Sequence, residues 1–271
     1  MGLMVSLTVA LLLLPAELLA TRAPLEMEIK EGVSATQVNS VKTAINDVFK
    51  FFLENYRINL HKTMLLIATP DEQSYSAALA KDFRMAQANA QESAKVSSGM
   101  ATESKDYYIL ALKLKPSTPT PSILKITCHE MVHWYQYKEG GQQKTGQHKW
   151  ISEGVATVLA CYIVDAQFKG EYERHRQYCL MTLKQASQIP SFGAVDGRQD
   201  WHAGMKKYGG SVIYSKAELA VMELAERHGI KSLFEYFRHL KHQTPEKAFR
   251  IVFKVSLKEF EKEMDQKFNK S

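Results

Sequence analysis

The sequence predicts an α+β fold in which helices dominate. Two short apolar runs, at residues 63–69 and 107–114, are each followed within two residues by a proline, as is typical of buried strands. Elsewhere, apolar residues recur at intervals of three and four, which is the spacing of an amphipathic helix. Two or three strands therefore mix with helices in the first half of the chain, and the second half is helical.

Three helices are expected in the first half of the chain. Residues 35–55 place apolar side chains on one helical face, and Ser34 or Thr36 is suited to cap the start of this helix. A second helix is expected from about residue 71 to residue 90. The third, at residues 122–138, is rich in apolar residues and contains neither glycine nor proline, which favours a buried helix.

The second half of the chain is expected to be a series of helices joined by short polar breaks. An apolar run that begins near Glu153 follows a polar, glycine-rich segment at residues 138–147, which we expect to reverse the chain. Residues 190–210 are expected to form an irregular loop. The remaining predicted helices cover residues 171–187, 212–228, 230–241, 245–253 and 256–268.

The first 23 residues have the pattern of a secretory signal peptide. An apolar core at residues 5–14 is followed by Pro15 and small residues, and cleavage is expected near Ala20 or Ala23. The core is shorter than the roughly 20 residues of a membrane span. Because no lysine or arginine precedes it, an uncleaved membrane anchor is the alternative. The protein is therefore expected to be exported, either secreted or periplasmic, with residues 24–271 as one domain. It is expected to contact a membrane only if the N-terminal segment is retained.

The formal net charge of +6 does not predict a nucleic-acid-binding protein. Lysines are interleaved with glutamates, notably at residues 254–270, and this pattern is more typical of a solvated helix face than of a phosphate-binding patch. The sequence shows no alternation of aromatic and basic residues of the kind that binds single strands. Adhesion of a basic exported protein to anionic polymers is one alternative function.

Three cysteines make an odd number for an exported chain. Cys161 and Cys179 lie on consecutive predicted helices and can pair if these helices are antiparallel neighbours; separate thiols are the alternative. Cys128 directly precedes a histidine of the motif described next, and we expect it to be a small buried side chain.

A short motif within the helix at residues 122–138 has the spacing of a metal site. His129 and His133 are four residues apart, so their side chains lie one above the other on a helix, and Glu130 flanks them. Hydrolytic zinc sites use three protein ligands and leave one position open for water. We expect Glu153 to be the third ligand, because the reversing segment can bring it back to the two histidines. The alternative is a buried helix with two incidentally spaced histidines.

The two segments together resemble the gluzincin metallopeptidases of the peptidase-MA-like superfamily. The motifs are H-E-M-V-H at residues 129–133 and, after 19 intervening residues, the glutamate of W-I-S-E-G-V-A at residues 150–156. They are most similar to the aminopeptidase-N-like enzymes. The resemblance implies a zincin-like catalytic domain with a small mixed sheet, one Zn²⁺ per chain, peptide or protein substrates, and Glu130 as the general base. Thermolysin-like members have an aspartate four residues after the ligand glutamate, where this chain has Thr157.

A third segment resembles the same family and concerns the residue that stabilises the oxyanion. The segment Tyr214–Leu224 resembles the Y-E-K-G helix start of the aminopeptidase-N-like family, which implies that Tyr214 donates to the transition state. Tyr208 is the second candidate for that role, and a tyrosine packed in the core is the alternative for Tyr214. His148 and His202 are possible substrate contacts, although structural or surface roles are more common for such histidines.

The expected substrate-binding strand departs from the family pattern. Aminopeptidase-N-like enzymes carry G-x-M-E-N on an edge strand, where the glutamate holds the free amine of the substrate. This chain has Ser98–Thr102 in the corresponding place, with Ala101 where that glutamate would stand. Endopeptidase activity is therefore favoured over strict aminopeptidase activity. The remaining alternatives are a catalytically silent binding protein on a peptidase scaffold and a zinc hydrolase of a non-peptide bond.

Overall fold

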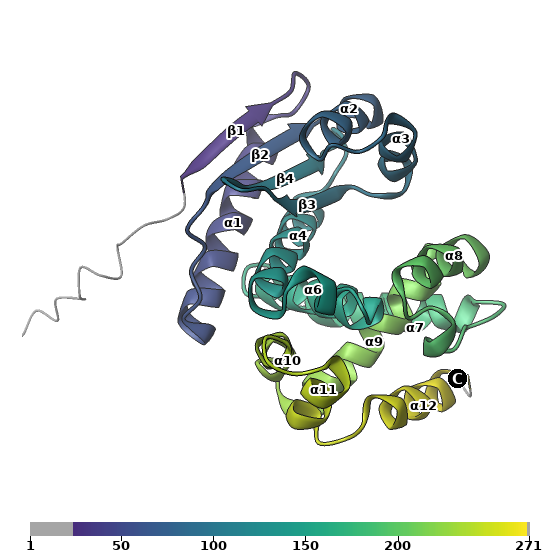
Figure 1. Ribbon diagram of the computed structural model, residues 1–271. Helices are drawn as coiled ribbons and strands as arrows, with labels where there is room; N and C mark the ends of the chain where they lie inside the picture. The colour runs from purple at the N-terminus through teal and green to yellow at the C-terminus, as the bar shows by residue number, and fades with distance from the viewer. Residues whose placement is uncertain (1–23, 270–271) are drawn as a thin grey trace, which may run out of the picture.

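A four-stranded mixed sheet forms the N-terminal half of the structure together with its covering helices, and the rest is helical (Figure 1). The structure is a computed structural model that describes residues 24–269. The expected signal peptide or anchor at residues 1–23 lies outside the described residues. Within the described part of the chain, no helix is long and apolar enough to cross a membrane. The expected α+β class and the dominance of helix are confirmed.

The strands of the sheet follow the order β1-β2-β4-β3. Strands β1 (Leu25–Ile29), β2 (Thr63–Thr69) and β4 (Tyr107–Lys113) run parallel, whereas β3 (Gly99–Glu103) pairs with β4 in the antiparallel direction. The two strands predicted from apolar runs, β2 and β4, occupy the centre, where a strand is covered on both faces and carries few polar residues. Strand β3 is an edge, so one side of its backbone is not paired within the sheet.

Helices cover both faces of the sheet. One face carries α1 (Ala35–Tyr56) and α4 (Thr120–Gly140), and the other carries α2 (Glu72–Asp82) and α3 (Gln87–Val96). Neighbouring residues of the central strands point to opposite faces and supply the two apolar cores. Leu66 and Leu110 pack with α1 and α4, while Ile67 and Ile109 pack with α2 and α3. Of the two expected caps of α1, Ser34 is the one that accepts the capping hydrogen bond.

Two expected segments are wrong. The single helix expected at residues 71–90 is divided into α2 and α3, because Arg84 adopts a left-handed backbone conformation, with φ at 55°, directly after α2. The irregular loop expected at residues 190–210 contains a helix, α8 (Arg198–Tyr208), which is held in place by the buried ring of Trp201. Most residues of α8 are polar, so its short apolar stripe is difficult to recognise in the sequence.

The helical half follows the predicted boundaries closely. Helices α9 to α12 begin and end within two residues of the limits expected from the sequence. Between α4 and α6 the chain reverses at Gly141, where φ is 73°, and passes through the short helix α5. The bounds are α5 (Gln142–Thr145), α6 (Lys149–Asp165), α7 (Glu171–Gln185), a 3₁₀ helix (Phe192–Ala194), α9 (Gly210–His228), α10 (Ser232–Leu240), α11 (Pro245–Phe253) and α12 (Leu257–Phe268).

All three cysteines are buried thiols. The disulfide considered between Cys161 and Cys179 is not formed. The Cys179 thiol instead donates to a carboxylate oxygen of Glu218 over a sulfur–oxygen distance of 3.1 Å. Cys128 is fully buried in the main apolar core, as expected.

Helix α6 packs closely against α9 around Gly154. A Cβ atom at this position would lie 2.7 Å from Val221 Cγ2 and 2.8 Å from the backbone oxygen of Ala217. Because glycine has no Cβ, the two helix backbones can approach here. The approach brings side chains of α9 next to Glu153, the neighbour of Gly154 on α6.

Replacing Gly154 by alanine is expected to force α6 and α9 apart. We expect Gly154→Ala to lower the free energy of unfolding by about 1–3 kcal/mol, as overpacking commonly does, and to lower Tm by about 2–4 °C for each kcal/mol lost. Gly193→Ala is the matched control, because an added Cβ there meets no atom within 4 Å. Calorimetric melting of both variants tests the close approach, and a wild-type Tm for Gly154→Ala would contradict it.

Candidate metal centre

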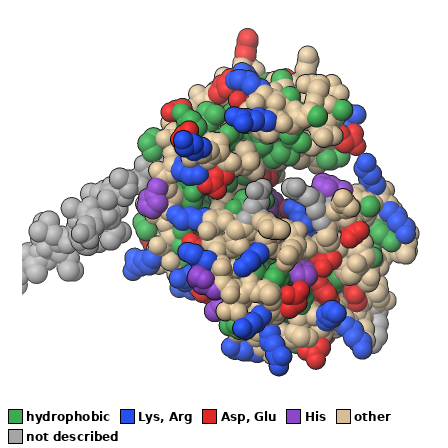
Figure 2. Space-filling view, viewed as in Figure 1, with side chains coloured by type: hydrophobic (Ala, Val, Ile, Leu, Met, Phe, Trp, Pro, Cys, Tyr) green, Lys and Arg blue, Asp and Glu red, His purple; other side chains and the backbone are tan. Residues whose placement is uncertain are grey.

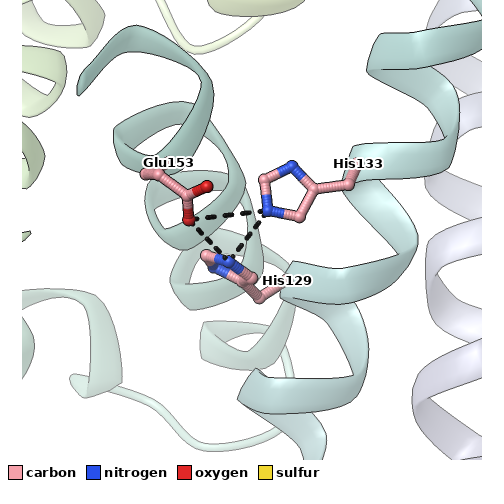
Figure 3. Close-up of side chains that lie close together, drawn as sticks. All are labelled: His129, His133 and Glu153. Carbon is pink, nitrogen blue, oxygen red and sulfur yellow. Dashed lines mark hydrogen bonds and ion pairs between the residues drawn. The ribbon is translucent and has the colours of Figure 1, made fainter. Parts of the chain in front are cut away.

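Helices α4 and α6 bring the three predicted ligands together (Figure 3). His129 and His133 extend from successive turns of α4, and Glu153 extends toward them from α6. The two Nε2 atoms are 3.1 Å apart. Glu153 Oε2 lies 3.4 Å from His129 Nε2 and 3.6 Å from His133 Nε2. Glu153 and His133 are only 5% and 6% exposed, so the three donor atoms meet inside the protein.

These distances match the spacing of ligands around a tetrahedral metal ion. Nitrogen and oxygen ligands bind zinc at about 2.0–2.2 Å, so two of them at a tetrahedral angle lie about 3.3–3.5 Å apart. All three ligand residues also line one cleft. An ion held by them therefore has an open side, as hydrolytic metal sites do and closed structural sites do not.

A hydrogen bond on the far side of the His133 ring sets its tautomer. Gln136 Nε2 donates to the backbone oxygen of Ser152 over 3.0 Å, so Gln136 Oε1 is the atom that faces His133 Nδ1, at 2.9 Å. The Nδ1 atom must therefore carry the ring hydrogen, and Nε2 presents a lone pair to the site. Sequence reasoning missed Gln136, although it lies one helical turn after His133.

Thr157 has the same effect on His129. Its Oγ1 lies 3.1 Å from His129 Nδ1, and its side chain also helps to lower the pKa of the buried Glu218 carboxylate. A hydroxyl at this distance can accept from Nδ1, and His129 Nε2 then presents a lone pair to the site. Thr157 stands where thermolysin-like enzymes have an aspartate, so a hydroxyl takes the place of a carboxylate beside this imidazole. Glu218 has no sequence motif that marks it as part of this arrangement.

Three electron-pair donors thus converge with no hydrogen between them. The lone pairs on the two Nε2 atoms and the Glu153 carboxylate repel one another at 3.1–3.6 Å unless a cation lies among them. Burial by itself would raise the pKa of Glu153, but the adjacent Lys149 ammonium holds that pKa well below its usual value, so the carboxylate is ionised. The residues present therefore fit a divalent metal ion with nitrogen and oxygen ligands.

Lys149 is a further site residue that sequence reasoning missed. It lies one helical turn before Glu153 on α6, and its Nζ contacts Oε1, the carboxylate oxygen that does not face the histidines. The contact turns the carboxylate so that only Oε2 points at the two imidazoles. The spacing of four residues is visible in the sequence, but a lysine beside a metal ligand is unexpected because it repels the ion.

Glu130 lies beside the ligands, against the edge strand β3. Burial raises the pKa of Glu130 to about 7, against the opposing effects of His129 and of the nearby Ala101 backbone N–H. A carboxylate with a near-neutral pKa can both accept a proton and give it up. Gly99 makes room for this side chain, since a Cβ there would lie 2.7 Å from Glu130 Cγ and 2.9 Å from Ile126 Cγ2.

Tyr214 reaches the centre from α9. Its hydroxyl donates to Glu153 Oε2 over 3.3 Å, and its ring packs edge-on against Trp201 with the ring centroids 5.3 Å apart. Burial, together with the charges of Glu153 and Glu130, holds the pKa of Tyr214 well above its usual value, so the phenol keeps its proton. Tyr208, the second candidate, packs against the core and does not line the cleft.

The metal centre opens into a cleft of about 780 Å³ between the sheet half and α8, visible as a hollow in Figure 2. His202 on α8 lines the cleft, which keeps it a candidate substrate contact. His148 lies outside the cleft, and its Nδ1 is 2.8 Å from an Asp196 oxygen. Burial opposes the charge on this imidazole, but Asp196 outweighs burial and raises the pKa of His148, so its role is structural. The sheet side of the cleft presents the apolar side chains of Phe83, Met85, Val96, Met100 and Ile126, interspersed with the polar residues Ser93, Ser97, Ser98 and Thr102.

No protein-family model matches the chain, and no curated protein matches it at a significant level. The resemblance to gluzincins therefore depends on the motifs at residues 129–133 and 150–156 and on the geometry around them.

Removing the Thr157 hydroxyl is expected to weaken metal binding. Thr157→Val keeps the shape of the side chain but leaves His129 Nδ1 without its partner, and loss of such a partner typically lowers metal affinity by about 10- to 100-fold. Thr182→Val, on α7, is the matched control because the Thr182 hydroxyl bonds only to the backbone of its own helix. Zinc competition against a coloured chelator measures both variants. Equal affinities for Thr157→Val and the wild type would show that the hydroxyl does not orient His129.

Proposed function

We propose that the protein is an exported zinc-dependent peptidase. The observation that carries the proposal is the convergence of two imidazoles and a carboxylate at tetrahedral spacing, with a further carboxylate, Glu130, in the same cleft. Two histidines and one glutamate are the donor set of hydrolytic zinc sites. The exported location depends on the pattern of residues 1–23 alone.

A zinc ion held by His129, His133 and Glu153 supplies a Lewis acid that lowers the pKa of water and polarises a carbonyl. Glu130 then serves as the base: its carboxylate accepts a proton from the attacking water and delivers this proton to the departing amine. A pKa of about 7 suits both steps. The missing side chain of Gly99 leaves room for the Glu130 side chain beside strand β3.

Tyr214 is assigned to the developing oxyanion. Its O–H points to Glu153 Oε2, at 3.3 Å, and therefore into the space that a bound carbonyl oxygen would share with the ligands. The buried ring of Trp201 packs against the Tyr214 ring and holds it in this orientation. Because the pKa of Tyr214 is raised, it donates a hydrogen bond without losing its proton.

The cleft favours an extended peptide with an internal cleavage site. The edge strand β3 lines the cleft, and an unpaired strand edge can add an extended peptide as a further strand. The apolar wall favours apolar substrate side chains next to it. Glu130 and Glu153 are the only carboxylates among the described residues that line the cleft, and both already have roles. No third carboxylate is placed there to hold a free amine, which supports endopeptidase over strict aminopeptidase activity.

An unbiased peptide library tests the proposal when the zinc content of the same sample is measured. We expect cleavage next to apolar residues, loss of cleavage with chelator, and recovery on adding zinc. Protein that holds zinc but cleaves nothing would favour a silent binding protein on this scaffold or a hydrolase of a non-peptide bond. Binding to anionic polymers that falls with salt and ignores chelator would favour the adhesive alternative.

Neutralising the base should separate metal binding from turnover. We expect Glu130→Gln to keep zinc and to lose about 10²- to 10⁴-fold in kcat, since the amide cannot accept the proton. Glu139→Gln removes the same charge from the same helix outside the cleft and is the control. Metal analysis and peptide cleavage are measured on one preparation. A fully active, zinc-loaded Glu130→Gln protein would refute this assignment of the base.

Removing the third ligand should affect metal retention first. Glu153→Ala is expected to bring the zinc content after dialysis well below one ion per chain, because two imidazoles alone leave the ion exposed to exchange. Glu173→Ala, an exposed change on α7, controls for the loss of a glutamate. Unchanged zinc content in Glu153→Ala would exclude Glu153 as a ligand.

A further inference from the structure

A second cluster of metal-binding side chains lies behind the first. His175 and Cys179 lie on α7, four residues apart, and Glu218 extends toward them from α9. His175 Nε2 is 3.0 Å from Glu218 Oε2, and Cys179 Sγ is 3.1 Å from the same oxygen. The ligand atoms of the three residues all lie within 4.8 Å of one another. Cys179 is 0% exposed and Glu218 is 5% exposed, so the cluster is almost completely buried.

The cluster repeats the arrangement of the first centre with a different donor set. Two side chains one helical turn apart meet a glutamate from a neighbouring helix, as His129, His133 and Glu153 do. Here the donors are an imidazole nitrogen, a thiol sulfur and a carboxylate oxygen. A set that contains sulfur favours zinc and other thiophilic cations over magnesium or calcium.

We propose that His175, Cys179 and Glu218 form a second metal site that binds a thiophilic divalent cation such as zinc. The site is separate from the proposed hydrolytic centre and does not depend on peptidase activity. The carboxylate of Glu218 accepts from the thiol and from the imidazole, so it points at both proposed ligands.

Binding replaces two hydrogens by one ion. The Cys179 thiol loses its proton to solvent and binds as thiolate, since only the thiolate is a strong metal ligand. His175 binds through Nε2, with its ring hydrogen moved to Nδ1. The ion thus takes the place of the S–H and N–H groups that Glu218 now accepts, and its charge offsets those of the thiolate and the carboxylate.

The ion can reach this site from the cleft. His175 lines the same cleft as His129 and Glu130, whereas Cys179 and Glu218 lie behind it. A fourth ligand position on the His175 side therefore faces solvent. Thr157 lies between the two centres, because its Oγ1 is 3.1 Å from His129 Nδ1 and its side chain also affects the pKa of Glu218. For this reason Glu218 itself is not a clean test residue, and the variants below change His175 and Cys179.

Cobalt(II) distinguishes the two centres because only the second contains sulfur. Metal-free, full-length protein is titrated with Co²⁺ while bound metal and the ultraviolet absorption of thiolate-to-cobalt charge transfer are recorded. We expect two ions per chain and a charge-transfer band in the wild type. Cys179→Ser should lose the band and bind one ion, while His129→Ala should keep the band. Cys161→Ser is the thiol control and should keep it as well.

A second variant keeps the test valid if Cys179→Ser fails to fold. His175→Gln removes the imidazole ligand but keeps a side chain that can donate to Glu218. We therefore expect the fold, judged by its melting temperature, to be kept. The affinity for the Co²⁺ ion that gives the charge-transfer band should fall at least about 10-fold. One ion per chain with no charge-transfer band in the wild type would overturn the proposal. A band that persists in Cys179→Ser would also overturn it, because the sulfur would then come from another residue.

Discussion

The structure depends on three electron-pair donors that face one another at 3.1–3.6 Å inside the protein. Gln136 places the hydrogen of the His133 ring on its outer side, and the Thr157 hydroxyl can accept from the His129 ring in the same way, so that lone pairs point inward. Lys149 neutralises one oxygen of Glu153 and leaves the other directed at the histidines. Such an arrangement is unfavourable without a cation and strongly favourable with one, so the neighbouring groups suit a bound metal ion.

The two halves of the molecule contribute different parts of this centre, and α4 joins them. The sheet half supplies the strand edge and the backbone N–H that faces Glu130. The helical half supplies Glu153 from α6 and Tyr214 from α9. Two glycines mark where these parts come closest: Gly99 leaves room for Glu130, and Gly154 lets α9 approach α6. The site therefore forms only when the two halves pack together, and the cleft lies along their boundary.

The ligands were predictable because helical geometry places residues four apart on one face, and the central strands were predictable because burial on both faces makes them apolar throughout. Strand β1 was missed because Glu26 and Glu28 interrupt its apolar residues on a partly exposed edge. Arg84 interrupts a predicted helix because its backbone is left-handed, and an arginine in the sequence does not predict that conformation. The partners of the ligands were harder still, since Thr157 and Glu218 meet only after α6 and α9 pack together.

X-ray diffraction from crystals grown with zinc, recorded on both sides of the zinc absorption edge, tests the central claim most directly. An anomalous peak is predicted about 2.0–2.2 Å from the Nε2 atoms of His129 and His133 and from Oε2 of Glu153. Zinc bound by other residues, with Glu153 Oε2 beyond bonding distance of any ion, would contradict the account.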